Sequence, residues 1–165
     1  MKQIILAHGR GTVLVDDEDY ERVASHSWCL LRGGGQRKRT YAQANIKRNG
    51  KWQRTLLHRF ILDAKAGQRV DHRDNNGLNC QRSNMRFATP SQNQHNSGRR
   101  IYKGMRSSRF KGVHWAKHVG KWLAQIACDR KRFYLGLFIE EEDAARAYDQ
   151  KAKELHGEFA KLNFR

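Results

Sequence analysis

The sequence predicts an α+β protein made of two small domains, in which short antiparallel strands come before the helices. Three observations lead to this prediction. Short runs of β-branched and aromatic residues are separated by turn residues along most of the chain. One long run of apolar residues at helical spacing follows near the C-terminus. A chain of 165 residues provides for one average domain or two small ones, and a basic stretch after residue 98 favours two.

The first domain, residues 1–98, is predicted to begin as an antiparallel meander. The glycines at residues 33–35 and the pair Asn49-Gly50 are typical of turns between strands. The acidic run Asp16–Asp19 is expected to begin a short helix that reaches Ala24, because the helix dipole favours negative charge there. We interpret this run as a helix cap, with a catalytic carboxylate cluster as the alternative. The strands are expected at residues 4–6, 12–15, 28–31, 40–42 and 55–57.

A β-β-α unit is predicted within the same domain, at about residues 56–98. A short strand ends at Asp71-His72, and a loop rich in asparagine and glycine follows. The second strand is Met85 to Ala88, and a helix begins at Thr89-Pro90, where threonine suits the N-cap and proline the first helical position. This unit places Asp71 and His72 at a strand end, with Asn93 on the first turn of the helix opposite.

The second domain, residues 108–165, is predicted to be a three-stranded sheet covered by one helix. A polar, basic linker at residues 99–107 precedes it. The helix is expected from Glu140 to His156, with acidic residues first and Gly157 as its C-terminal cap. Its alanines allow it to lie close to one face of the sheet, so the other face is expected to present arginine, lysine and tryptophan side chains. The strands are expected at residues 112–115, 121–127 and 131–138.

The composition of the chain indicates a polyanionic partner. Lysine and arginine number 33 against 16 acidic residues, which gives a net charge of +17. With 38% hydrophobic residues and four tryptophans the chain has the composition of a folded protein, so we expect it to bind nucleic acid. Basic residues are densest between residues 99 and 139, and Arg99, Arg100 and Lys103 in the linker are expected to follow a phosphate backbone.

Several other classes of protein are excluded by the same sequence. No stretch approaches the roughly 18 apolar residues of a membrane span, and residues 1–9 lack the apolar segment of a signal peptide. Cys29, Cys80 and Cys128 are widely separated, odd in number and without a C-x-x-C pair. We therefore expect packing thiols, and neither a disulfide framework nor a cysteine-ligated zinc site.

The β-β-α unit contains the residue types that phosphodiester hydrolysis needs. The carboxylate of Asp71 and the amide oxygen of Asn93 are hard donors that suit Mg²⁺ or Mn²⁺. The imidazole of His72 can accept a proton from an attacking water near neutral pH. The alternative is that the Asp-His pair forms a turn or a salt bridge without any catalytic role.

This pattern resembles the HNH, or ββα-metal, motif of phage and intron-encoded homing endonucleases, with His72 at the first position, Asn84 at the second and Asn93 in place of the final histidine. The resemblance implies that His72 is the general base, that Asn84 orients the loop, and that Asp71 and Asn93 bind one divalent metal. Asparagine in place of the final histidine implies modest, oxygen-preferring metal binding. By the same resemblance His58 is structural. His95 lies two residues beyond Asn93, which on a regular helix points it away from the metal, and we expect it to contact a DNA phosphate. The upstream segments that share this resemblance are residues 16–20, 27–28, 40–42 and 57–62.

A second resemblance rests on five motifs: residues 109–113, 120–122, 134–138, 144–149 and 161–164. In this order they resemble an AP2 DNA-binding domain. That family implies a sheet, backed by a helix, that enters the major groove of DNA. His114 and Gln125 replace an arginine and a glutamate common in plant members, so the plant target sequence is not implied. The side chains that we expect to contact DNA are Arg109, Lys111, His114, Lys117, Lys121, Gln125, Arg132 and Tyr134.

Together these patterns predict a site-specific, Mg²⁺- or Mn²⁺-dependent DNA endonuclease of the HNH homing type, which nicks or cuts both strands. One alternative is an AP2-type transcriptional regulator that keeps only a structural β-β-α unit. Another is an RNA-binding protein, against which the AP2 resemblance counts. The expected partner is double-stranded DNA, with no membrane partner. We expect a monomer, with a dimer as the alternative, in the cytoplasm, which would be that of the host cell for a phage-encoded protein.

Overall fold

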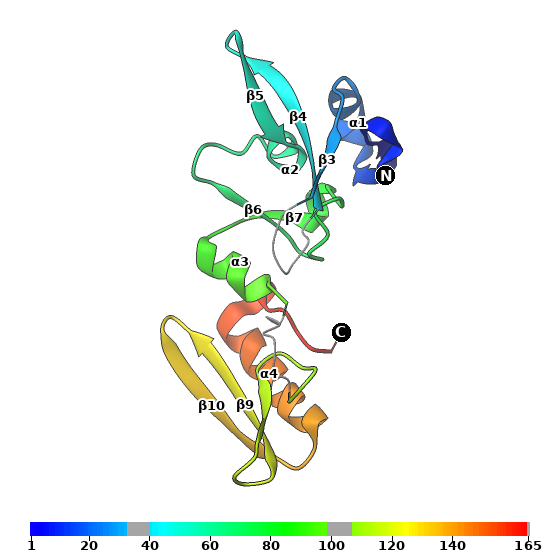
Figure 1. The fold of residues 1–165 in the computed structure, drawn as a ribbon. Coiled ribbons are helices and arrows are strands. Elements are labelled where there is room, and N and C mark those ends of the chain that lie inside the picture. The colour runs from blue at the N-terminus through cyan, green and yellow to red at the C-terminus, as the bar shows by residue number, and fades with distance from the viewer. Residues whose placement is uncertain (33–39, 99–106, 165) are drawn as a thin grey trace. The chain divides into compact units, whose positions relative to one another are not determined.

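The computed structural model describes residues 1–32, 40–98 and 107–164, which form two compact units, Met1–Pro90 and Ser91–Arg165. Figure 1 follows the chain through both units. The predicted mixture of helices and antiparallel strands is confirmed, since every ladder between two described strands is antiparallel. The boundary between the units comes after Pro90, earlier than the predicted one at residue 98. Residues 99–106 of the predicted linker lie outside the described residues.

The first unit begins with a hairpin and continues into a meander. Strands β1 (Lys2–Ile5) and β2 (Thr12–Val15) pair with each other, and a three-stranded sheet follows in the order β3-β4-β5. The predicted turn at Asn49-Gly50 is confirmed: both residues have positive φ, at 50° and 77°, which a tight two-residue hairpin turn requires. The strands of the meander are β3 (Cys29–Arg32), β4 (Thr40–Arg48) and β5 (Lys51–Leu56).

The predicted strand at residues 55–57 is partly wrong. Strand β5 ends at Leu56, and Leu57 begins the short helix α2 (Leu57–Ile61). Leu57, Phe60 and Ile61 are buried in the core of this unit, and their i, i+3, i+4 spacing places them on one helical face. Helical periodicity therefore prevails over the strand propensity of Thr55 to Leu57.

The core of the first unit lies between these elements and helix α1 (Asp17–Ala24). Trp28 is almost fully buried, and its indole N–H donates to the backbone oxygen of Val23 at 2.8 Å. Cys80 is also fully buried in this core, and burial raises the pKa of its thiol to about 12. Its role as a packing thiol agrees with the prediction.

The acidic residues before α1 bind an arginine instead of capping the helix. Asp16 is the N-cap residue, but its side chain makes no capping bond. Its Oδ2 accepts the backbone N–H of Arg82 at 2.7 Å, and the buried carboxylate of Asp19 accepts two guanidinium bonds from Arg82 at 2.7 and 2.8 Å. The predicted side-chain cap is therefore wrong, because the carboxylate of Asp16 accepts hydrogen bonds from Gln81 and Arg82 of a distant loop and none from the N–H groups of α1.

The last two strands of the first unit are β6 (Arg69–His72) and β7 (Met85–Ala88), which pair with each other and lie where the sequence predicts them. The loop between them ends in a 3₁₀ turn at Arg82–Asn84. Helix α3 (Pro90–Asn96) begins at the predicted proline, and all of it beyond Pro90 belongs to the second unit.

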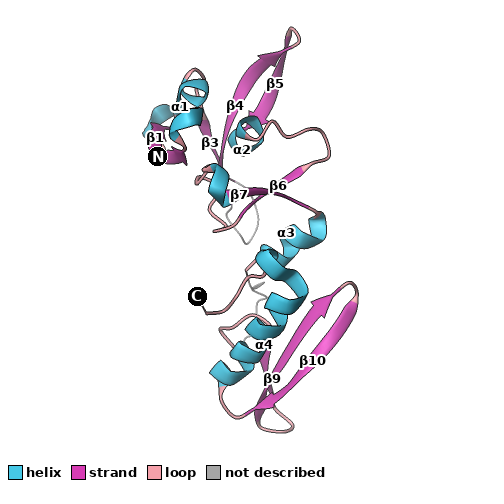
Figure 2. Cartoon of the chain, turned by 180° about the vertical axis from the view of Figure 1, so that it is seen from behind, coloured by secondary structure: helices cyan, strands magenta, loops and turns pink. Residues whose placement is uncertain are grey.

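The second unit contains the predicted three-stranded sheet and its covering helix, and Figure 2 shows helix α4 lying along β9 and β10. Buried alanines on α4, among them Ala144 and Ala145, pack against Ala124 of the sheet, so small side chains allow the close approach. Gly157 ends α4 with a φ of 50°. The elements are β8 (Val113–Ala116), β9 (Lys121–Cys128), β10 (Lys131–Phe138) and α4 (Glu141–His156), in the sheet order β10-β9-β8.

Gly112 allows the chain before β8 to pass close to α4. It has a φ of +79°, and a Cβ atom there would collide with the ring of Tyr148. The backbone oxygen of Gly112 accepts the N–H of Gln125 at 2.9 Å, which continues the pairing along the edge of β9. No helix within the described ranges is long and apolar enough to span a membrane.

Candidate functional site

Asp71 of the predicted metal site lies in a buried ion pair. The register of β6 and β7 places Asp71 directly opposite Arg86, whose Nε and Nη2 donate to Asp71 Oδ2 at 3.1 and 3.0 Å. Both side chains are less than a tenth exposed. A carboxylate buried in this way needs a paired positive charge. Arg86 was not predicted as a partner of Asp71, although pairing the two predicted strands from their outer ends places it opposite Asp71.

His72, the predicted general base, packs among aromatic rings. Its ring centroid lies 5.1 Å from that of His58, edge to face, and 6.0 Å from that of Tyr41. Tyr41 also contacts His58, with 5.3 Å between their centroids. The loop after β6 lies close against β4 at Gly77. A Cβ atom on Gly77 would collide with the backbone oxygen of Thr40 and with the Tyr41 ring, so only glycine allows this approach.

His58 is buried and is held in its neutral form. Burial, and to a smaller extent the positive charges of His72 and Arg59, lower the pKa of His58 to about 3. At neutral pH His58 therefore adds no positive charge beside His72. The sequence analysis assigned His58 a structural role, and its place in the packing agrees with that role.

We expect the depressed pKa of His58 to make the first unit less stable in acid. The pKa is about 6.5 in the unfolded chain and about 3 in the folded one, so the unfolded chain binds more protons between these values. Stability is therefore full above pH 6.5 and falls by about 1.4 kcal/mol per pH unit as the pH drops towards 3. In denaturant unfolding measured from pH 7 to pH 4, His58→Asn should lose less stability than the wild type. The exposed-site control His8→Asn should follow the wild type, and equal acid sensitivity in all three proteins would contradict this assignment.

Asn84 holds the loop that follows His72. Its side-chain amide donates to Asp74 Oδ1 at 3.0 Å and to the backbone oxygen of Asn79 at 2.8 Å, and its Oδ1 accepts the N–H of Asp74 at 3.1 Å. Its backbone oxygen accepts the N–H of Arg73 at 2.8 Å. Asn84 thus connects the start of the loop, at Arg73 and Asp74, to Asn79 in its middle.

Asp74 is the partner of Asn84 that the sequence analysis missed. Burial alone would raise its pKa, but hydrogen bonds from the N–H of Asn76 and from the side chains of Asn79 and Asn84 outweigh burial and lower it. The bond from Asn76 N to Asp74 Oδ1, at 2.7 Å, is an Asx turn. The run Asp74-Asn75-Asn76-Gly77 is the sequence signal that would have indicated it.

Asn93, the second predicted metal ligand, lies on α3 and belongs to the second unit, whereas Asp71, His72 and Asn84 belong to the first. Its pairing with Asp71 around a metal ion stays a prediction. The donor types fit a hard cation, because one is a carboxylate oxygen and the other an amide oxygen.

Five of the predicted DNA-contacting residues share one face of the second sheet. Gln125 pairs with Tyr134, and Arg132 pairs with Ala127, so these side chains lie on the face turned away from α4. Tyr134 is 62% exposed there. His114 pairs with Leu123 on the same face, and Lys121 alternates onto it. Strand alternation thus gathers these side chains on one surface.

The other predicted DNA contacts have different surroundings. Arg109 binds the start of α4, where its Nη2 donates to Glu142 at 2.6 Å and its backbone N–H to Glu141 at 3.0 Å. The ammonium of Lys111 donates to the backbone oxygens of His95 and Ser97 at 2.7 and 3.0 Å. Lys117 is exposed in the turn between β8 and β9. Arg99, Arg100 and Lys103 lie outside the described residues.

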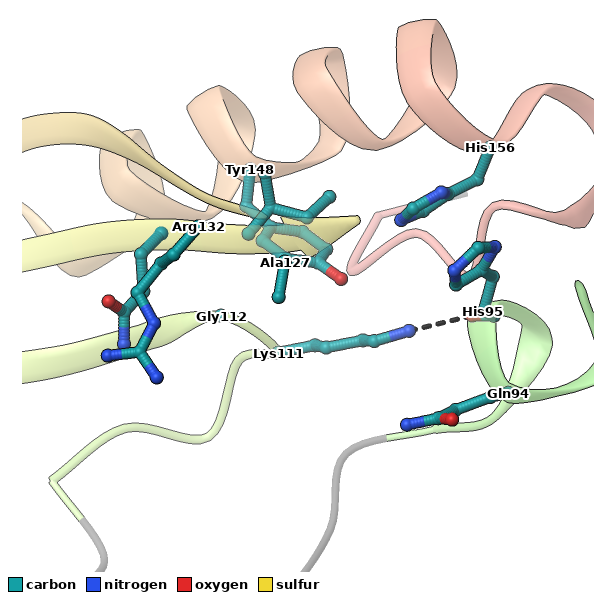
Figure 3. A pocket seen from close by; sticks show the side chains of 10 residues that line it. Gln94, His95, Lys111, Gly112, Ala127, Arg132, Tyr148 and His156 are labelled. Carbon is teal, nitrogen blue, oxygen red and sulfur yellow. Dashed lines mark hydrogen bonds between the residues drawn. The ribbon is translucent and has the colours of Figure 1, made fainter. Parts of the chain in front are cut away.

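A pocket of about 300 Å³ opens at the edge of β9 in the second unit, where β8 no longer covers that strand. Figure 3 shows Lys111 crossing it towards His95, with Arg132 at one end and His156 at the other. Gln125 also lines the pocket, which is therefore continuous with the basic face of the sheet.

Known proteins resemble this chain in two ways, one limited to the AP2 domain and one that spans almost the whole chain. Residues 108–158 match the model of the AP2 domain family, which confirms the predicted domain and implies DNA binding. Over 162 residues the chain is 29% identical to a protein of Acanthamoeba polyphaga mimivirus named as an uncharacterized HNH endonuclease, and the alignment covers 96% of this chain and 79% of the viral protein.

The similarity to plant proteins spans about a third of the chain. The chain is 48% identical over 58 residues to an AP2/ERF and B3 domain-containing protein of Oryza sativa subsp. japonica, and this alignment covers 35% of the chain and 16% of the rice protein. The chain is also 42% identical over 57 residues to the dehydration-responsive element-binding protein 2A of Arabidopsis thaliana. This alignment covers 33% of the chain and 17% of the Arabidopsis protein. The plant proteins therefore share one module with this chain.

Proposed function

We propose that this protein is a metal-dependent DNA endonuclease of the HNH type, in which the AP2 domain holds the DNA. The observation that carries the proposal is the Asp71-His72 pair at the end of β6, followed by a loop held by Asn84. The near full-length similarity to a protein named as an HNH endonuclease supports it.

Each residue of the predicted site then has one role. His72 accepts a proton from the attacking water. The neighbouring His58 is neutral, so it does not repel the positive charge that His72 gains. Asp71 and Asn93 would hold one Mg²⁺ or Mn²⁺ through oxygen atoms. When bound, the cation would stabilise the negative charge that develops on the phosphate and on the leaving 3′ oxygen. Arg86 keeps the Asp71 carboxylate oriented, and a cation would share that carboxylate with it.

A second candidate function is that of a DNA-binding regulator without nuclease activity. The buried Asp71–Arg86 pair favours it, because the Arg86 guanidinium already balances the charge of the Asp71 carboxylate without a metal ion. The likeness of the AP2 domain to plant proteins named for binding a response element also favours it.

Cleavage of a defined double-stranded DNA separates the two functions. We expect discrete ends in the presence of Mg²⁺ or Mn²⁺, mapped by sequencing, and none with a chelator. Ends on one strand would identify a nicking enzyme, and ends on both strands a double-strand cutter. Tight, salt-sensitive binding without metal-dependent ends would contradict the nuclease and favour the regulator.

The exposed face of the second sheet should carry the DNA affinity. We expect Arg132→Ala to weaken DNA binding by about 1–3 kcal/mol and to reduce the salt dependence of binding if the contact is to a phosphate. The matched control is Lys153→Ala, which removes an exposed positive charge from α4, the helix on the other side of the sheet. Binding measured by fluorescence anisotropy at several salt concentrations tests this, and an equal loss in the two variants would argue for unspecific charge attraction.

A further inference from the structure

Two histidines and a cysteine from three separate elements meet at one end of the second unit. His95 comes from α3, Cys128 from the end of β9 and His156 from the last turn of α4. One potential ligand atom from each lies within 4.8 Å of the other two. All three residues belong to the compact unit Ser91–Arg165.

The imidazoles of His95 and His156 lie face to face, as Figure 3 shows. Their ring centroids are 3.6 Å apart and their planes make an angle of 17°. His156 is buried, and its Nδ1 has no hydrogen-bond partner among the described residues. A buried nitrogen without such a bond costs free energy unless something else binds it. The hydroxyl of Ser91 lies 3.3 Å from His95 Nε2, where it can accept the Nε2 proton and leave the lone pair on Nδ1.

We propose that His95, Cys128 and His156 bind a zinc ion. Two imidazoles and one thiolate form a donor set of the type found in zinc sites, and a water molecule or another ligand completes the tetrahedron. The bond lengths of zinc to nitrogen and sulfur place ligand atoms about 3.4–3.6 Å apart, so side-chain rotations that shorten the present separations by about 1 Å are sufficient.

The charges around the three residues partly favour a divalent cation. The carboxylate of Asp129 lies 3.5 Å from Cys128 Sγ and adds negative charge next to the thiol. Lys111 opposes the cation, because its ammonium is held at the backbone oxygen of His95. A thiolate and the carboxylate of Asp129 offset the ammonium of Lys111 and the guanidinium of Arg130, which lines the pocket beside Cys128, so the donor set and not the net charge favours Zn²⁺.

A metal ion at this position would tie α3 to the end of the sheet and to α4. Helix α3 has only seven residues, and helices of that length are held by packing and not by their own hydrogen bonds. Because the sequence contains no C-x-x-C pair, it predicted no cysteine-ligated zinc site. The tertiary structure instead brings together three ligands from positions 95, 128 and 156.

Cobalt titration of the full-length, reduced protein tests the proposal. Co²⁺ bound to a thiolate gives a near-ultraviolet charge-transfer band, whereas an all-oxygen site at Asp71 and Asn93 would give none. We expect this band to saturate at one equivalent of Co²⁺ and to disappear when Zn²⁺ is added. In Cys128→Ser the band should vanish and the affinity for the metal should fall at least tenfold, while Cys29→Ser, the matched control, should behave as the wild type.

Thermal unfolding provides a second readout that does not depend on nuclease activity. Zn²⁺ should raise the melting temperature of the wild type and of Cys29→Ser, but not that of Cys128→Ser, because binding to the folded state alone stabilises it. Circular dichroism establishes that each variant is folded. Absence of the charge-transfer band in the wild type, or its persistence in Cys128→Ser, would overturn the proposal.

Discussion

His72→Ala should lower the rate of DNA cleavage by a factor of about 10² to 10⁴ and leave DNA affinity within about twofold of the wild type, because a general base contributes on that scale. His72 is the last residue of β6 and directly follows Asp71 in the sequence. DNA affinity should remain because the AP2 domain lies in the other compact unit. Single-turnover cleavage and equilibrium binding, measured on the same DNA, test both parts of this prediction.

Controls must separate lost chemistry from lost folding, because His72 is buried. His72→Gln keeps a polar side chain of similar size and should be equally inactive. Added imidazole should restore part of the activity to His72→Ala if the missing group is a base. His8→Ala removes an exposed histidine of the same unit and should cut at the wild-type rate. Wild-type cleavage by a folded His72→Ala would refute the general-base role.

Arg86→Leu should destabilise the first unit by about 3–5 kcal/mol, because it leaves the Asp71 carboxylate buried without its partner. This is the largest stability effect that we expect from a single substitution. Urea unfolding at pH 7, followed by tryptophan fluorescence, measures it. The buried Trp28 reports on the same unit.

The double variant Asp71→Leu/Arg86→Leu is the decisive comparison. Replacing both members of a buried pair by apolar residues is often nearly neutral, so the double variant should be more stable than Arg86→Leu alone. Lys151→Ala, which breaks an exposed pair with Glu154, should cost no more than about 1 kcal/mol. A cost below about 1 kcal/mol for Arg86→Leu would show that the Asp71 carboxylate finds other compensation. The double variant should also be inactive as a nuclease, since it lacks the proposed metal ligand.

Local sequence signals predicted the elements whose residues agree with their own propensities. The paired strands at residues 69–72 and 85–88, the turn at Asn49-Gly50 and the helix that ends at Gly157 all lie close to where the sequence placed them. In each case a turn or cap residue marks the boundary, and the physical requirement is local. Helix α2 was missed because its five residues follow directly on a strand pattern, and the i, i+3, i+4 spacing of Leu57, Phe60 and Ile61 covers little more than one turn.

The residues of the candidate sites were also predicted only as far as local signals allow. By itself the sequence determined the net positive charge and predicted the type of chemistry, because the basic composition, the Asp-His pair and the AP2 motifs depend only on residue identity and order. Strand alternation was also sufficient to place Gln125, Arg132 and Tyr134 on one face.

Only the tertiary structure decided which groups lie beside those residues. Arg86 opposite Asp71, His58 beside His72, and Cys128 beside His95 and His156 are contacts between positions far apart in the chain. Such contacts follow from strand register and from the packing of buried faces, which local propensity does not encode. Burial then sets the charge of these groups, since the same histidine is neutral in a packed core and titrates near pH 6.5 in the unfolded chain.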